Sequence, residues 1–198
     1  MDFSEAKDYI VGRLVKELPR DLYYHGAHHT FDVVKSVHSL SVAEKLNNAD
    51  FFLLLTAAYY HDAGYIYRYE HNEAVAVKMA RQTLPDFGYS PEHLDKIEGI
   101  IMATSHHIEP VTNLEKIMCD ADHDYFGRHD YQKIAVSLRK ELAVYEGEYS
   151  DEIWLSKQIK YLENNHKYYT ETALATRQPK KEHRIAILKE QLKNLVNA

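Results

Sequence analysis

The stretch Ala57-Ala58-Tyr59-Tyr60-His61-Asp62-Ala63-Gly64-Tyr65 places an imidazole and a carboxylate side by side at the end of an apolar run. Residues 53–55 are all leucine, so the segment predicts a buried helix that ends near His61. A histidine and an aspartate at the end of such a helix are costly to desolvate unless something compensates them. A bound divalent cation is one compensation, and a hydrogen-bonded His beside a helix-terminal Asp is the structural alternative.

The composition is typical of a helical globular protein. The chain has 198 residues, of which 45% are hydrophobic and 27% are charged, and this length is enough for a substantial core. Only 7 Gly and 5 Pro leave few positions for hairpin turns, which favours an all-α fold. We therefore expect a helical bundle that forms one domain over residues 1–198.

Several classes of protein are disfavoured by the sequence. The single Cys119 cannot form an internal disulfide, and the start Met1-Asp2-Phe3-Ser4-Glu5 does not resemble a secretory signal. The apolar runs fall well short of the roughly twenty residues that a membrane helix needs. A net charge of −6 argues against a general nucleic-acid binder, and the basic residues 180–193 alternate with apolar ones as in a packing helix. We expect a cytoplasmic protein without a membrane partner.

Apolar residues at spacings of three and four predict helices along most of the chain. The second helix is expected to open at His29 or Thr30, the third to be capped by Asp50 and ended by Gly64, and the fifth to run from Ser90 to His106-His107. Trp154 is expected to be buried. The expected helices span residues 4–18, 29–46, 51–61, 71–84, 90–107, 114–121, 131–145, 150–169 and 180–195.

Ligand-type side chains recur where these helices start or stop. His29 lies at a helix start, His61 and Asp62 lie at a helix end, and Asp122 ends a later apolar element. Helix ends that meet in a bundle bring such side chains together. Two imidazoles and two carboxylates suit a divalent Mn, Fe, Co, Ni, Zn or Mg ion and leave coordination positions open for water.

The ordered pattern His…His-Asp…Asp on helices resembles the HD-domain superfamily of metal-dependent phosphohydrolases. The local context is similar to a small, stand-alone branch, in which a Tyr-His-x-x-x-His-Thr-x-x-Val segment, here residues 24–33, precedes Ala-x-x-His-Asp-x-Gly-Tyr, here residues 58–65. Residues 120–122, Asp-Ala-Asp, followed by Phe-Gly-Arg at 126–128, resemble the closing motif of that branch. The resemblance covers about residues 23–128, and we expect the helices of residues 129–198 to pack on that core.

The resemblance implies His29, His61, Asp62 and Asp122 as metal ligands. His28 is adjacent to His29, but the spacing to Thr30 and Val33 favours His29. Asp120 competes with Asp122, and Asp122 is preferred because it directly follows Ala121.

Further histidines stand near expected helix ends. Some HD proteins use histidines at such places for a second metal or for the substrate phosphate, which makes His71 and the pair His106-His107 candidates. His71 is followed by Asn-Glu-Ala-Val where the family often has Glu-x-x-Ser, so His71 is left open between the site and the surface. One of His106 and His107 is expected at the site, with His106 preferred.

Three residues are candidate contacts to a substrate phosphate. They are Arg128, whose guanidinium matches phosphate oxygens, together with His107 and His25. Arg128 is equally well interpreted as a helix-end cation, and His25 as a residue that orients its loop. We interpret the remaining histidines, including His123, as structural or solvated.

The resemblance implies a metal-dependent phosphohydrolase that acts on a small phosphorylated substrate, such as a nucleotide, through a metal-activated water. Asp62, His71 or His106 is expected to shuttle a proton. The residues do not choose between a phosphomonoesterase and a phosphodiesterase, and they do not define the oligomeric state. Two alternatives remain: a di-iron oxygenase that uses His71 and His106 as added ligands, and a regulatory module that binds a nucleotide without turnover.

Overall fold

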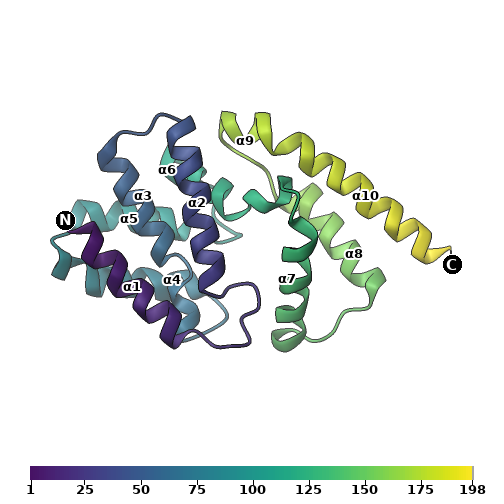
Figure 1. Cartoon of the computed structure of the whole chain (residues 1–198), viewed down its shortest axis with the longest axis horizontal. Coiled ribbons are helices and arrows are strands. Elements are labelled where there is room, and N and C mark those ends of the chain that lie inside the picture. The colour runs from purple at the N-terminus through teal and green to yellow at the C-terminus, as the bar shows by residue number, and fades with distance from the viewer. Residues whose placement is uncertain (198) are drawn as a thin grey trace.

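The computed structural model describes residues 1–197 and contains helices and turns but no strand in that range (Figure 1). The all-α prediction is therefore confirmed. The N-terminal part comprises α1 (Phe3–Glu17), α2 (Ala27–Ala43), α3 (Asn48–Tyr60), α4 (Asn72–Thr83), α5 (Pro91–Met102) and α6 (Asn113–Asp122), with the short turns η1 (Ala63–Ile66), η2 (Leu84–Phe87) and η3 (Asp124–Gly127).

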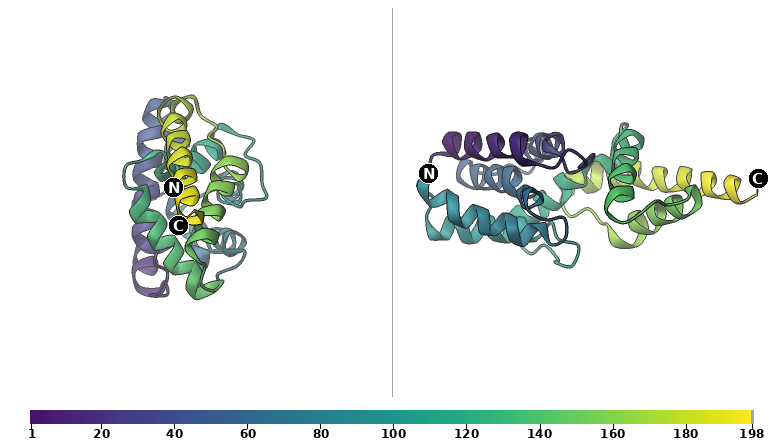
Figure 2. Two further views of the ribbon diagram at one scale, coloured as in Figure 1. Left: turned by 90° about the vertical axis from the view of Figure 1, so that its right-hand side faces the viewer. Right: turned by 90° about the horizontal axis from the view of Figure 1, so that it is seen from below.

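The C-terminal part comprises α7 (Tyr131–Tyr145), α8 (Asp151–Lys160), the π-helical turn η4 (Tyr161–Asn165), α9 (Glu171–Thr176) and α10 (Gln178–Val196). Seen from below, α1 to α5 lie at one end of the molecule and α10 extends toward the other (Figure 2). α10 packs on α8, on α9 and on η3. These helices reach the N-terminal part through η3, the turn that directly follows α6, and through contacts of α9 with α2.

Helix α3 is the centre of the N-terminal part. It packs against α1, α2 and α5, and its residues 53–58 are all buried. This explains its continuous apolar sequence, because a helix covered on several sides has no polar face to keep. Its C-terminal end, which carries His61 and Asp62, is consequently inside the protein.

Two glycines allow close backbone approaches around the residues that follow these helices. A Cβ atom on Gly64 would lie 1.9 Å from the backbone oxygen of Asn72, so only glycine lets η1 pack on the start of α4. A Cβ atom on Gly127 would lie 2.7 Å from the backbone oxygen of Arg177. Gly127 therefore lets η3 approach the segment that leads into α10.

Some expected helix boundaries are wrong at their N-terminal ends. α2 begins at Ala27, after Gly26 at the N-cap, rather than at His29 or Thr30. α3 begins at Asn48 because Asn47 is its cap, and the Asn47 side chain accepts a hydrogen bond from the backbone N–H of Asp50. Asp50 lies inside the first turn, where its negative carboxylate interacts favourably with the positive end of the helix dipole.

Others are wrong at their C-terminal ends. α3 ends at Tyr60, before Gly64, and α5 ends at Met102, so His106 and His107 lie in a loop. The side chain and backbone N–H of Thr104 both bond to the carbonyl of Ile101, which competes with continuation of the helix. The predicted helix over residues 150–169 stops at η4, and the chain beyond it is extended. The Ser90 cap and the buried Trp154 are confirmed.

One cluster of buried apolar side chains runs from Ala6 in α1 to Leu188 in α10. It includes residues of both the N-terminal and C-terminal parts, and the prediction of one domain stays a prediction that this cluster supports. No helix within residues 1–197 has the length and apolar character to cross a membrane.

Candidate metal centre

Three helix ends bring together the four side chains that the sequence singles out. His29 lies in the first turn of α2, His61 and Asp62 follow α3 directly, and Asp122 is the last residue of α6. The contacts of α2 with α3 and α6 hold these ends side by side. The apolar stripes that bury each helix therefore also position its polar end.

The polar atoms of the cluster lie close together. Nε2 of His29 is 3.0 Å from Oδ1 of Asp122 and 3.5 Å from Oδ2 of Asp62. Nε2 of His61 is 3.2 Å from Oδ2 of Asp62 and 3.7 Å from Oδ1 of Asp122. His29, His61 and Asp122 each offer a ligand atom, and these atoms lie within 4.8 Å of one another. Asp62 is not one of these three, but its Oδ2 atom lies within 3.5 Å of both imidazole nitrogens and completes the candidate ligand set.

The donor set fits a divalent cation. Nδ1 of His61 lies 2.8 Å from the carbonyl oxygen of Ala58, and because a carbonyl only accepts, Nδ1 carries the proton in the neutral ring. Nε2 then has a lone pair directed at the carboxylates. Neither Nε2 of His61 nor Oδ2 of Asp62 has a hydrogen-bond partner among residues 1–197, although both atoms are buried. Two such atoms facing each other are costly unless a positive charge lies between them, supplied either by a proton on Nε2 or by a divalent cation that replaces it.

The pKa values of His61, Asp62 and Asp122 also indicate that positive charge is favoured in the cluster. Burial lowers the pKa of His61, but the charges of Asp62 and Asp122 outweigh burial and raise it to about 9. Burial raises the pKa of Asp62 and of Asp122, but neighbouring imidazoles lower both below the usual range of a carboxyl group. At neutral pH the cluster therefore holds two carboxylates, and His61 beside them is protonated.

The surroundings of His28 differ from those of His29, and the surroundings of Asp120 differ from those of Asp122. The ring of His28 is exposed, whereas His29 is buried in the cluster. Asp120 points away and accepts hydrogen bonds from the backbone N–H groups of Tyr169 at 2.9 Å and Thr170 at 2.8 Å. Burial raises the pKa of Asp120 to about 6 in spite of these bonds.

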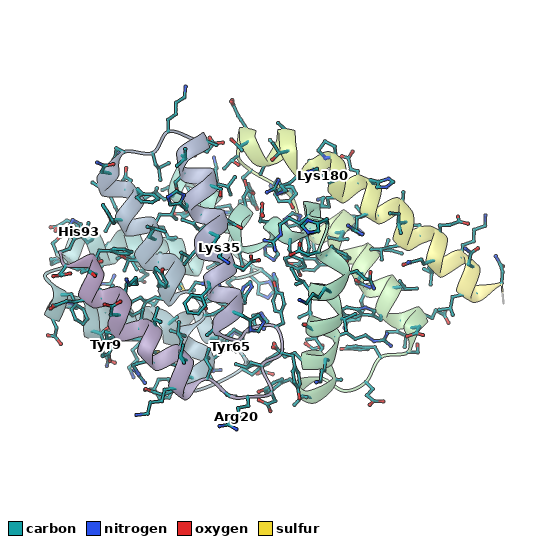
Figure 3. All side chains as sticks on the ribbon, viewed as in Figure 1. Tyr9, Arg20, Lys35, Tyr65, His93 and Lys180 are labelled. Atoms are coloured by element: carbon teal, nitrogen blue, oxygen red, sulfur yellow. The ribbon has the colours of Figure 1, made fainter. Side chains whose placement is uncertain are left out.

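A cavity of about 450 Å³ opens beside the cluster. One wall comes from the N-terminal part and includes Asp62, Asp122 and His25, and the opposite wall comes from α7, α8 and η4. Figure 3 labels Tyr65, which stacks on the ring of His25 in the first wall at a centroid separation of 4.5 Å. The volume lies in the range of roughly 300–1,000 Å³ that is usual for small-molecule sites.

The remaining sequence candidates divide into two groups. His25 and His106 line the cavity, and Nδ1 of His106 lies 3.1 Å from the hydroxyl of Tyr161. His71 and His107 are exposed and, within the described chain, lie outside the cavity wall. Their roles stay predictions.

Arg128 is held by other carboxylates. Its guanidinium bonds to Asp130 and Asp32 at 2.6 to 2.9 Å and lies 3.6 Å from Asp124. These ion pairs join η3 to α2, and the described part of the cavity wall does not include Arg128.

Glu141 of α7 is a residue that the sequence interpretation missed. It is fully buried, accepts hydrogen bonds from the backbone N–H groups of Tyr24 and His25, and contacts the His25 imidazole. Burial lowers the pKa of His25, but contact with the Glu141 carboxylate raises it above its ordinary value. Its spacing of three from Leu138 on the inward face of α7 is the one sequence feature that could have indicated burial.

His123 was also missed, because it was interpreted as structural or solvated. It lines the cavity directly after Asp122, and its Nε2 atom lies 3.2 Å from the hydroxyl of Tyr161. Burial lowers the pKa of His123, which favours the neutral ring. Tyr161 therefore contacts His106 and His123 from the opposite wall, and it does so from a π-helical turn, a feature that is frequent at functional sites.

The structure is that of an all-α protein in which a cluster of side chains that could hold a divalent cation lies at the meeting point of helix ends. The family model of the HD domain matches residues 26–127, which is more than half of the chain. The protein therefore belongs to the HD-domain family, whose members are in general metal-dependent phosphohydrolases.

The structure is similar to that described as the crystal structure of Bacillus subtilis YpgQ in complex with ADP. The two share 19% sequence identity with a TM-score of 0.67, over 98% of this chain and 97% of that chain. At this identity the similarity shows a common fold, which includes the C-terminal helices. None of the curated proteins compared with the sequence matches it.

Proposed function

We propose that this protein is a metal-dependent phosphohydrolase that acts on a nucleotide or another small phosphate ester, with His29, His61, Asp62 and Asp122 as the metal ligands. The observation that carries the proposal is the pair of buried atoms, Nε2 of His61 and Oδ2 of Asp62, that face each other without a hydrogen bond within residues 1–197. A divalent cation satisfies both atoms at once, and the neighbouring cavity has room for an ester.

A bound divalent cation supplies a Lewis acid for the phosphoryl oxygen and lowers the pKa of water. The protein supplies orientation. The carbonyl of Ala58 holds Nδ1 of His61, so the ring presents Nε2 to the cluster in a fixed direction. The carboxylate of Asp62 is placed to take a proton from an attacking water.

Two histidines in the cavity wall are placed to contact the phosphate. Glu141 holds Nδ1 of His25, which leaves Nε2 of that ring for a phosphate oxygen. The hydroxyl of Tyr161 engages Nδ1 of His106, which leaves Nε2 of His106 for the leaving oxygen. In this proposal His106 delivers the proton, since it lines the cavity and His71 lies outside the described cavity wall.

The nucleotide as substrate is supported by the size of the cavity and by the aromatic character of its lining. It is also consistent with the fold shared with YpgQ, a protein whose structure was solved in complex with ADP. The di-iron interpretation has less support, because His71 is exposed and the described residues contain one group of at least three clustered ligand side chains.

The test is a phosphate-release screen of nucleotides, cyclic nucleotides and sugar phosphates with added Mn²⁺ or Co²⁺. We expect turnover of at least one ester by the parent and loss of that turnover in His61→Ala and Asp62→Ala, while the exposed His183→Ala in α10 retains it. The proposal would be contradicted if no ester were turned over, or if both His61→Ala and Asp62→Ala kept full activity. Iron content of two per chain with oxygen consumption would replace it by the oxygenase, and tight nucleotide binding without product would replace it by the regulatory module.

A further inference from the structure

The two walls of the cavity differ in chemistry. The wall from the N-terminal part carries the charged cluster, whereas the wall from α7 and α8 presents Ala135, Leu138, Leu142 and Trp154. An ester bound with its phosphate at the cluster therefore turns the rest of the molecule toward an apolar surface. A sugar alone, with hydroxyl groups on every side, would be poorly matched to this surface.

Polar side chains also line this wall, and of Glu146, Lys157 and Gln158 only Gln158 is buried. Gln158 of α8 is only 9% exposed, and its Oε1 atom accepts a hydrogen bond of 2.8 Å from the hydroxyl of Tyr131, which is 2% exposed. Because Oε1 is engaged in this way, the amide N–H groups are the part of Gln158 that is left to face the cavity. A purely aliphatic ligand group that displaced water from this donor would leave it unpaired, whereas an acceptor on the ligand would replace the water.

The positions of these residues along the helix determine how far the apolar wall extends from the cluster. Tyr161 contacts His123, the neighbour of Asp122, and Trp154 lies seven residues earlier on the same helical stretch. At a rise of about 1.5 Å per residue, Trp154 is roughly 10 Å from Tyr161 along the axis, with Gln158 between them. The wall is thus long enough for a group attached to the phosphate through a sugar.

We propose that the wall formed by α7 and α8 is a subsite for the planar heterocycle of a nucleotide, in which Gln158, oriented by Tyr131, donates a hydrogen bond to an acceptor on the ring edge. A heterocycle has apolar faces for Leu138, Leu142 and Trp154 and acceptors at its edge for the amide. Gln158 is then a specificity-determining residue. This inference rests on the proposed function, because the cluster must take the phosphate.

Trp154 is the only tryptophan of the chain, so its fluorescence reports on this subsite directly and without turnover. The experiment titrates the full-length, Mn²⁺-loaded protein with nucleoside 5′-monophosphates and with ribose 5-phosphate, which has the same phosphate and sugar but no base. We expect a saturable change in emission with nucleotides and none with ribose 5-phosphate. Gln158→Leu should weaken nucleotide binding about fivefold to tenfold, the effect of one lost hydrogen bond.

Two further variants provide a second test and a control. Tyr131→Phe retains the ring but frees the amide of Gln158 to turn, and it should raise the KM for nucleotides while leaving kcat unchanged. Gln132→Leu, at an exposed glutamine on α7, should leave nucleotide binding unchanged. If Gln158→Leu fails to fold, Tyr131→Phe decides the question, and a KM, or in the absence of turnover a dissociation constant from Trp154 fluorescence, equal to that of the parent would then overturn the proposal.

The outcomes separate this inference from the proposed function. Equal hydrolysis of ribose 5-phosphate and nucleotides with an unchanged Trp154 emission would overturn the subsite while the phosphohydrolase stands. Nucleotide binding that depends on Gln158, without turnover of any ester, would retain the subsite while the proposed activity falls. Parent-like nucleotide affinity in a folded Gln158→Leu protein overturns the subsite in either case.

Discussion

Oε2 of Glu141 accepts a hydrogen bond of 2.9 Å from the backbone N–H of His25, and the other carboxylate oxygen of Glu141 contacts the imidazole of the same residue. The two residues are 116 positions apart in the chain. This contact joins α7 to the loop that precedes α2, so the C-terminal helices help to position His29, one of the proposed metal ligands.

Removal of the Glu141 carboxylate should destabilise the protein. We expect Glu141→Ala to lower the free energy of unfolding by about 3 kcal/mol, because the two backbone N–H groups and the partly buried His25 ring lose their partner. Glu141→Gln should cost less, since its amide oxygen still accepts. Urea denaturation at pH 7 measures both, with the exposed Glu148→Ala as the control, for which a change within about 0.5 kcal/mol is expected. Equal stability of Glu141→Ala and Glu148→Ala would contradict the structural role.

The neighbouring aspartates Asp120 and Asp122 should give opposite results. Asp120→Ala leaves the backbone N–H groups of Tyr169 and Thr170 unpaired and should lower the free energy of unfolding by about 2–3 kcal/mol, with Mn²⁺ affinity retained. Asp122→Ala should reduce Mn²⁺ affinity by at least about tenfold. Denaturation in EDTA and calorimetric titration with Mn²⁺ separate the two effects. Loss of Mn²⁺ binding in Asp120→Ala with retention in Asp122→Ala would show that the ligand assignment is wrong.

Metal binding should depend on pH through His61. Its pKa is raised to about 9 in the metal-free protein, so the ring carries a proton at pH 7 that a metal must displace. Mn²⁺ affinity should therefore rise about tenfold for each pH unit up to about pH 9, with release of about one proton per ion at pH 7. Titration calorimetry in two buffers of different ionisation enthalpy counts the proton. Affinity that is independent of pH between 6 and 8 would contradict this protonation state.

Local patterns in the sequence predict much of the fold. The helix expected over residues 131–145 is α7, Tyr131–Tyr145, and the helix expected over 4–18 is α1, displaced by one residue. Both have regular apolar stripes and clear ends. The errors lie where a side chain competes with the backbone: Asn47 starts α3 early, Thr104 stops α5, and Asp120 binds the extended backbone after η4. Such competition depends on individual hydrogen bonds, which periodicity does not describe.

The proposed metal ligands could be named from the sequence because each occupies a short motif with fixed neighbours. Glu141 and Gln158 have no such motif. Their partners, His25 and Tyr131, lie 116 and 27 residues away in the chain, and a lone Glu or Gln in a helix resembles a solvated residue until those partners are placed. The cavity wall opposite the cluster is therefore a property of the tertiary structure, which the sequence patterns near His61 and Asp62 do not describe.

The most direct test of the central claim is an anomalous-difference map of crystals of the full chain loaded with Mn²⁺. We predict a peak at about 2.0–2.3 Å from Nε2 of His29, Nε2 of His61 and carboxylate oxygens of Asp62 and Asp122. A map without a peak at this cluster, or with its only peak elsewhere on the protein, would contradict the account.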